Sequence, residues 1–319
     1  MTKTIEAAEM AGGGTVDTVA PHPIPQEAFD WYDEYAHGLI DRRTFLSRLA
    51  GLSAAGYSMA LLTSALLPNY AEAEQVSFND PDIKATYETF ASPKGNQQGK
   101  GYLVVPVRSA ENKSHKKSAV LVVHENRGLN PYIKDVARRV AKAGYIAFAP
   151  DGLYPAGGYP GNDDDGRALQ AGMDREKLEQ DFIAAAYHIK NHALANGKLG
   201  AVGFCFGGYI VNMLAATMGK DLDAGVPFYG TPAAASIRKN IKAPLLVQLA
   251  ELDTRVNATW PEYEQALKAN QVQYKMVMYP KTQHGFHNDS TARFDPANAE
   301  LAWQKTLNFF DTYLKSDSE

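Results

Sequence analysis

The stretch Lys198-Leu199-Gly200-Ala201-Val202-Gly203-Phe204-Cys205-Phe206-Gly207-Gly208 decides the fold of this 319-residue chain. Its first seven residues form a largely apolar run, which is typical of a strand buried on both faces of a sheet. Residues 207–218 continue as a helix. Between strand and helix lies a sharp turn of the form G-x-nucleophile-x-G, with sulfur in place of hydroxyl. Glycines are needed two residues on either side of Cys205, because side chains there would collide with the turn.

Cys205 occupies the position that a nucleophile takes in such a turn. The amide N–H groups and the positive dipole end of the following helix point at it and favour the thiolate, the reactive form of cysteine. The backbone N–H of Phe206 would supply one donor to an oxyanion. Cys205 is the only cysteine of the chain, so it has no internal disulfide partner. The alternative is a small buried hydrophobe, and the strand–turn–helix context argues against it.

Two further residues follow in the order acid, then histidine, in which the partners of a nucleophile in such a turn occur along a chain. Asp253 comes just after an apolar stretch at 244–250, and His284 follows a strand-like stretch at 273–279. The carboxyl ends of parallel strands meet at one edge of a sheet, where open α/β sheets bind ligands. We expect His284 to act as base and then as acid, and Asp253 to hold its ring and fix its tautomer.

Two neighbouring residues are alternatives for these roles. Glu251 could replace Asp253, although strand alternation points it elsewhere. His287 could replace His284, although Gly285 permits the sharp loop that an exposed histidine needs. The two histidines form only an H-x-x-H pattern, without a second cysteine or the helical H-E-x-x-H of metalloproteases. We therefore expect no metal and no cofactor.

Strand-like and helix-like stretches alternate from residue 80 to 316, which predicts a doubly wound, mostly parallel sheet with helices on both faces. The expected strands lie at 101–106, 119–124, 145–150, 198–204, 223–229, 244–250 and 273–279. The expected helices lie at 131–143, about 174–195, 207–218, 260–270 and 297–314. Residues 151–166 are expected to form a loop. Within it, Asp163-Asp164-Asp165 lacks the pattern of a calcium loop and is expected to be solvated.

Four separated motifs make residues 85–316 resemble the dienelactone hydrolase (carboxymethylenebutenolidase) family of the α/β-hydrolase superfamily. They are His124-Glu125-Asn126-Arg127-Gly128, the turn at 203–208, Asp253, and His284-Gly285-Phe286. The likeness extends into residues 25–70 for bacterial members with an N-terminal helical extension. It implies an α/β-hydrolase fold and hydrolysis of a small-molecule ester or lactone through an acyl-thioester. The alternative is a non-catalytic binding or interaction protein on a hydrolase scaffold.

The resemblance implies further roles that the turn alone does not. Glu125, after the first buried strand, would contact the cysteine and help to control thiol ionisation. The backbone N–H of Asn126 would be the second oxyanion donor. A carboxylate in a dry pocket can accept the thiol proton. The alternative is that Glu125 only caps the helix that starts at Pro131 or pairs with Arg127.

Arginines hold the substrate carboxylate in this family, one of them four residues after the catalytic histidine. That position is Asn288 here, so a carboxylated substrate does not follow from the resemblance. Arg127 and Arg167 are the candidate anion-binding residues. The aromatic residues that could line an apolar pocket are Tyr154, Tyr159, Phe204 and Trp260.

The N-terminal part of the chain has a different character. Residues 1–24 are mostly small, polar and glycine-rich and predict a disordered tail, whereas residues 25–75 contain apolar positions at helical spacing. Asp41-Arg42-Arg43-Thr44-Phe45-Leu46, the apolar run at 50–67 and Ala71-Glu72-Ala73 together resemble a twin-arginine export signal. We therefore expect export to the periplasm. The alternative is a cytoplasmic protein with an uncleaved helical arm that packs on the enzyme or on a second copy of the chain.

Charge and length exclude two classes of partner. The net charge is −4 and the sequence contains no basic stripe, so we expect no nucleic acid. The apolar run at 50–67 is near the lower limit of the ~17–25 residues that a membrane helix needs and is only moderately apolar, so we expect no stable membrane span.

Overall fold

The computed structural model describes residues 24–36, 39–53, 57–59, 62, 66, 69–70, 73–111 and 116–315. The expected disordered tail lies, apart from Ile24, outside the described residues. Ala71 and Glu72 of the expected cleavage pattern and much of the apolar run beyond Ser53 lie outside them as well.

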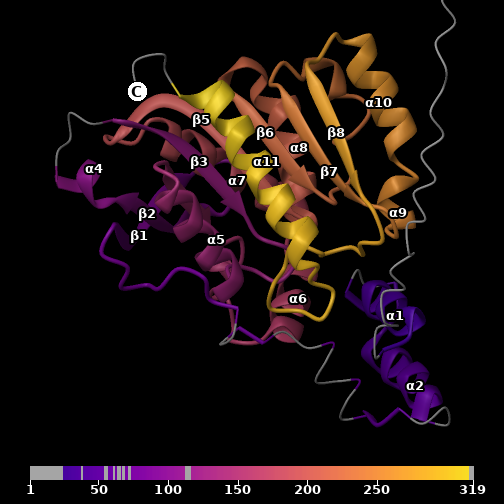
Figure 1. Ribbon diagram of the computed structural model, residues 1–319. Helices are drawn as coiled ribbons and strands as arrows, with labels where there is room; N and C mark the ends of the chain where they lie inside the picture. The colour runs from indigo at the N-terminus through magenta and orange to yellow at the C-terminus, as the bar shows by residue number, and fades with distance from the viewer. Residues whose placement is uncertain are drawn as a thin grey trace, which may run out of the picture.

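Within the described residues, eight strands form one sheet at the centre of the molecule (Figure 1). They are β1 (Ile83–Ser92), β2 (Gln97–Pro106), β3 (Lys117–Val123), β4 (Ile146–Pro150), β5 (Ala195–Phe204), β6 (Ala224–Phe228), β7 (Leu245–Ala250) and β8 (Tyr274–Tyr279). Their spatial order is β1-β2-β4-β3-β5-β6-β7-β8. The strands from β3 to β8 run parallel, whereas β2 pairs antiparallel with both β1 and β4.

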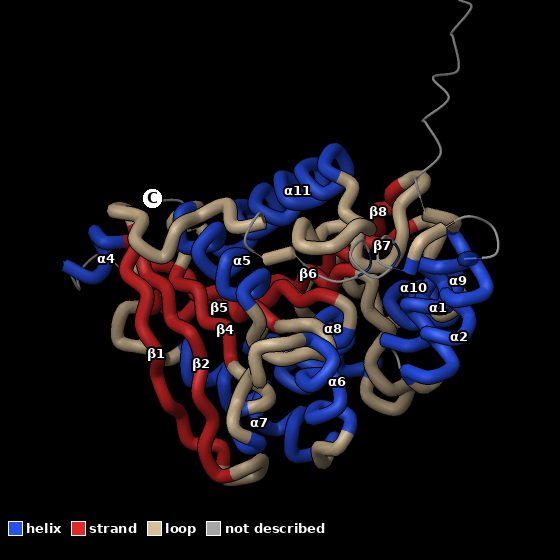
Figure 2. Tube along the Cα trace, turned by 90° about the horizontal axis from the view of Figure 1, so that it is seen from below, coloured by secondary structure: helices blue, strands red, loops and turns tan. Residues whose placement is uncertain are grey.

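Helices cover both faces of this sheet, which explains why the central strands are apolar on both sides. In β3, Leu121 and Val123 face one core, and Val120 and Val122 face the other. The first core contains side chains of α7 (Arg175–Lys190), α8 (Phe206–Met218) and α10 (Trp260–Ala269), and the second those of α5 (Pro131–Lys142) and α11 (Pro296–Leu314). Figure 2 shows α11 and α7 on opposite sides of the sheet. The shorter helices of this part are α4 (Val107–Glu111), α6 (Asp163–Ala171) and α9 (Thr254–Asn257).

The predicted doubly wound, mostly parallel sheet is confirmed. The helix expected at about 174–195 ends earlier, at Lys190, because β5 already begins at Ala195. β1 was not expected. It is an edge strand with mostly exposed or half-buried residues, so its sequence lacks the apolar run that marks the central strands.

The structure differs from the expectation that Asp163-Asp164-Asp165 lies in a loop. This stretch is not a loop but the first turn of α6, capped by the side chain of Asn162, which accepts a hydrogen bond from the backbone N–H of Asp165 at 2.9 Å. Asp165 is exposed, as expected. Carboxylates in a first turn are stabilised by the helix dipole. The side chain of Asp163 is only 8% exposed, and its Oδ2 accepts a hydrogen bond from Arg127 Nη1 at 2.7 Å.

The predicted helical extension consists of two helices, α1 (Gln26–Ala36) and α2 (Arg42–Ser53). Their buried apolar side chains form a cluster of their own, in which the ring of Tyr35 stacks on that of Phe45 with centroids 4.9 Å apart. We refer to residues 26–36 and 39–53 as the N-terminal hairpin. In the part of the chain that the structure describes, no helix combines the length and the apolar character needed to cross a membrane.

The turn between β5 and α8 leaves no room for a side chain two residues before or two residues after Cys205. Cys205 itself has a φ of 56°, in the left-handed region that residues other than glycine rarely adopt. A Cβ at Gly203 would lie 2.2 Å from the backbone oxygen of Gly207, and a Cβ at Gly207 would lie 2.3 Å from the backbone oxygen of Val123. The predicted requirement for glycine on both sides of the cysteine is therefore confirmed.

We expect Gly207→Ala to lower the free energy of unfolding by about 1–3 kcal/mol or more, because the added methyl group meets backbone that cannot move aside. Gly172→Ala is the matched control. Gly172 has an ordinary φ of −83°, and its added Cβ would approach no atom closer than 3.5 Å, so we expect a change within about 0.5 kcal/mol. Urea denaturation followed by circular dichroism measures both. Equal stability of the two variants would contradict the steric argument.

Candidate active site

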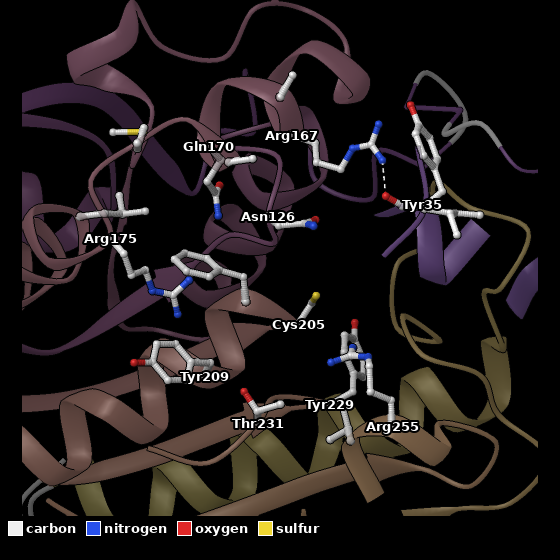
Figure 3. Close-up of a pocket in the computed structure, with 17 residues that line it drawn as sticks. Tyr35, Asn126, Arg167, Gln170, Arg175, Cys205, Tyr209, Tyr229, Thr231 and Arg255 are labelled. Carbon is white, nitrogen blue, oxygen red and sulfur yellow. Dashed lines mark hydrogen bonds between the residues drawn. The ribbon is translucent and has the colours of Figure 1, made fainter. Parts of the chain in front are cut away.

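A cavity of about 450 Å³ lies at the carboxyl ends of the parallel strands and contains the side chain of Cys205. Figure 3 shows the sulfur pointing into this cavity, between Tyr35 and Arg167 on one side and Arg175 and Tyr209 on the other. The lining residues come from the N-terminal hairpin and from segments after five of the strands: Tyr35, Ile40, Asn126, Arg167, Ala168, Gln170, Ala171, Met173, Arg175, Leu178, Cys205, Phe206, Tyr209, Tyr229, Thr231, Arg255 and Val256.

The structure brings together Asp253, after β7, and His284, after β8. Oδ2 of Asp253 accepts a hydrogen bond from Nδ1 of His284 at 2.5 Å. The other carboxylate oxygen accepts one from the backbone N–H of Val256 at 3.1 Å and so caps α9. The ring of His284 also packs on that of Tyr229, with centroids 4.9 Å apart, and Tyr229 lines the cavity with Cys205. The imidazole is therefore oriented by a buried carboxylate beside the cavity that holds the thiol.

The two alternative residues lie in different surroundings. Glu251 is exposed, and its Oε2 accepts a hydrogen bond from the backbone N–H of Lys281 at 2.7 Å. His287 is buried in the core, where Nδ1 lies 2.7 Å from the hydroxyl of Tyr132. Burial lowers the pKa of His287 to about 3, so the ring stays neutral. The geometry thus favours Asp253 and His284 over their neighbours.

Glu125 follows β3 and is buried. Its Oε2 accepts a hydrogen bond from Nδ2 of Asn288 at 2.9 Å. Burial raises the pKa of Glu125; the charge of Arg127 opposes this rise, and a thiolate at Cys205 adds to it. The carboxyl is therefore within electrostatic range of the thiol. It does not cap α5, because that role belongs to the side chain of Asn130.

His124 fixes the peptide group between Glu125 and Asn126, a role that the sequence did not suggest. Its Nε2 accepts a hydrogen bond from the backbone N–H of Gly152 at 3.0 Å. The ring proton is therefore on Nδ1, which donates to the backbone oxygen of Glu125 at 2.5 Å. Burial lowers the pKa of His124 and favours the neutral ring that this pair of bonds requires.

The two arginines predicted to bind an anion differ in position. Arg127 does not line the cavity. It is buried and forms an internal ion pair with Asp163. Arg167 does line the cavity. Its Nη1 donates to the backbone oxygen of Tyr35 at 2.6 Å, and its Nη2 to Oδ1 of Asp164 at 3.3 Å.

The aromatic lining also differs from the prediction. The cavity is lined by Tyr35, Phe206, Tyr209 and Tyr229, and not by Tyr154, Tyr159, Phe204 or Trp260. Sequence reasoning also missed Arg175 and Arg255. A cation within a helical stretch carries no sequence signal that separates a cavity-lining position from a solvated one, so only the packing of α7 and α9 reveals them.

Comparison with known proteins agrees with this geometry. A family model described as the dienelactone hydrolase family matches residues 101–314. The chain belongs to the dienelactone hydrolase family. It is therefore a hydrolase with an α/β-hydrolase fold. A second model, described as YqhI-like, matches residues 20–55, which include the N-terminal hairpin.

Individual relatives cover different parts of this dienelactone hydrolase homologue. YghX of Escherichia coli (strain K12), named as a candidate hydrolase fragment, is 64% identical over 109 residues, which are 34% of this chain and 90% of the relative. A candidate carboxymethylenebutenolidase of Aquifex aeolicus (strain VF5) is 32% identical and spans 70% of this chain and 96% of its own. The crystal structure of a candidate dienelactone hydrolase from Klebsiella pneumoniae superposes with a TM-score of 0.61 at 25% identity, covering 72% of this chain and all of the other.

Proposed function

We propose that this hydrolase cleaves carboxylic esters or lactones, with Cys205 as nucleophile, His284 as acid and base, and Asp253 as orienting carboxylate. The observation that carries the proposal is the 2.5 Å bond between His284 and Asp253 beside the cavity that contains the thiol. A nucleophile, a base and a group that orients the base are the set that acyl transfer requires. The name carboxymethylenebutenolidase, given to a relative that spans 70% of the chain, supports an ester or lactone as the substrate.

The first half-reaction forms a thioester. His284 takes the thiol proton, the sulfur of Cys205 attacks the carbonyl carbon, and the carbonyl oxygen gains the negative charge. The backbone N–H groups of Phe206 and Asn126 would stabilise this charge. Phe206 is the first residue of α8, where N–H groups have no partner within the helix. The C–O bond then breaks, and His284 protonates the leaving alkoxide. In a lactone the alcohol stays tethered to the acyl group.

The second half-reaction returns the enzyme to its starting state. His284 takes a proton from water, and the resulting hydroxide attacks the thioester carbonyl. The C–S bond breaks, the carboxylic acid leaves, and the proton held by His284 returns to the sulfur of Cys205. Each turnover consumes one water molecule and requires no oxidant or reductant.

Glu125 is proposed to control when the thiol ionises. A charged carboxylate close to the sulfur opposes the formation of a thiolate. Burial raises the pKa of Glu125 and so favours the neutral acid, in which form this opposition disappears. The hydrogen bond from Asn288 holds the carboxyl in place through either state, because an oxygen of the neutral acid can still accept it.

We expect Cys205→Ala to abolish turnover of nitrophenyl acetate, because it removes the sulfur that forms the proposed acyl-enzyme. Release of nitrophenol measures the rate. Intact-mass spectrometry of the wild type after rapid mixing should show one acetyl adduct that Cys205→Ala lacks. Thermal unfolding serves as the control for the fold. Turnover at the wild-type rate in Cys205→Ala would refute the mechanism.

We expect Glu125→Gln to shift the pH profile of Cys205 alkylation by iodoacetamide to lower pH, because the amide cannot place a negative charge beside the thiolate. The amide oxygen can still accept the hydrogen bond from Asn288, so the local packing is kept. Glu251→Gln, which changes an exposed carboxylate, is the matched control and should leave the profile in place. A profile in Glu125→Gln that coincides with the wild type would show that Glu125 does not control ionisation.

We also propose that the N-terminal hairpin remains part of the enzyme and is not removed as an export signal. The twin-arginine pattern at 41–46 opens α2, where Oδ1 of Asp41 accepts a hydrogen bond from the backbone N–H of Thr44 at 2.7 Å and Phe45 is buried. The same residues therefore suit a capped helix. N-terminal sequencing of the protein from its native cells should find the hairpin present. A mature chain that begins just after Ala73 would instead support export.

A further inference from the structure

The N-terminal hairpin supplies part of the wall around Cys205. Tyr35, near the end of α1, and Ile40, shortly before α2, both line the cavity. Figure 3 shows Tyr35 beside Arg167 at one end of the cavity, with Cys205 between that end and Arg175. The extension therefore contacts the same space as the proposed nucleophile.

Arginines that follow in the chain hold α1 at this place. Arg167 donates a hydrogen bond to the backbone oxygen of Tyr35, and its guanidinium carbon lies 3.5 Å from the centroid of the Tyr35 ring. One turn earlier, the ring of Tyr32 has the guanidinium carbons of Arg127 and Arg293 at 5.6 and 5.0 Å from its centroid. Guanidinium groups at these distances are attracted by the ring quadrupole. The aromatic face of α1 is thus fixed on cations of the hydrolase domain.

The second helix of the hairpin supports the same rings. The ring of Phe45 stacks on that of Tyr35 with an interplanar angle of 2°. It also packs against the ring of Tyr32 in a T-shaped arrangement, with centroids 6.0 Å apart. Moving Tyr35 aside would therefore break its contacts with both Phe45 and Arg167. The wall at this end of the cavity is a packed structure and not a single side chain.

We infer that Tyr35 and Ile40 determine the size of the substrate group that fits at the hairpin end of the cavity; as a statement about catalysis, this rests on the proposed ester or lactone hydrolysis. Ile40 has a branched aliphatic side chain without polar atoms, so it discriminates between substrate groups by their shape. The charge of Arg167 already has partners in Tyr35 and Asp164, so recognition at this end depends on volume more than on charge. In a hydrophobic pocket, one methylene group changes discrimination by about tenfold or more.

Ester specificity tests the inference with Ile40→Ala and Ile40→Trp, which enlarge and shrink the cavity at one position. We would measure kcat/KM for nitrophenyl esters of lengthening acyl chain and for acetates of lengthening alcohol. In at least one series, the preference for the longest over the shortest member should rise about tenfold in Ile40→Ala and fall about tenfold in Ile40→Trp. Leu46→Ala is the matched control, because Leu46 packs inside the hairpin and does not line the cavity. Unchanged preferences in both Ile40 variants, or an equal shift in Leu46→Ala, would overturn the inference.

Alkylation of Cys205 tests the wall without any turnover. Because the chain has one cysteine, N-substituted maleimides of increasing bulk report only the space beside its sulfur. The rate ratio of the bulkiest to the smallest maleimide should rise in Ile40→Ala, fall in Ile40→Trp and stay constant in Leu46→Ala. If no ester is hydrolysed but this ratio shifts, the proposed function is refuted, and the inference that the hairpin limits the space beside Cys205 is supported. If esters are hydrolysed and neither the ratio nor the ester preference shifts, only the inference about the hairpin is refuted.

Discussion

The close backbone contact between Gly207 and the carbonyl oxygen of Val123 is the constraint on which the site depends. A Cβ at position 207 would lie 2.3 Å from that oxygen, so the start of α8 can lie against the end of β3 only with glycine there. Glu125 and Asn126 follow Val123 by two and three residues, and Cys205 precedes Gly207 by two residues. One contact therefore fixes the proposed nucleophile, the carboxyl that would control it and a proposed oxyanion donor relative to one another.

In the proposed mechanism, this proximity lets the charge of Glu125 influence the ionisation of Cys205. The hydrogen bond to its carboxyl comes from the neutral amide of Asn288, and the nearby Arg127 shares its charge with Asp163 through a 2.7 Å ion pair. Desolvation is then the largest influence on the carboxyl and raises its pKa. A full cation at position 288 would hold Glu125 in the charged form, whereas an amide leaves it able to change state next to Cys205.

The features that could be predicted from the sequence are those with a local signal. The turn after β5 follows from an apolar run and its glycines, and Asp253 and His284 follow from their positions just after β7 and β8. Sequence spacing could not decide between His284 and His287, because both follow the same strand. The two histidines differ in their tertiary contacts. Nδ1 of His287 lies 2.7 Å from the hydroxyl of Tyr132 in the core, whereas His284 is hydrogen-bonded to Asp253.

The contacts of the N-terminal hairpin could be predicted from the sequence even less. The apolar spacing of α1 indicates a buried face but not its partner, because Arg167 lies 132 residues further along the chain than Tyr35. Only the folded chain shows that aromatic rings of α1 pack on guanidinium groups beside the cavity. The chemistry proposed here needs only the loops that follow β3, β5, β7 and β8. The space around the sulfur, by contrast, depends on a segment outside the sheet, so a change in that segment can alter what reaches Cys205 while the reacting groups remain the same.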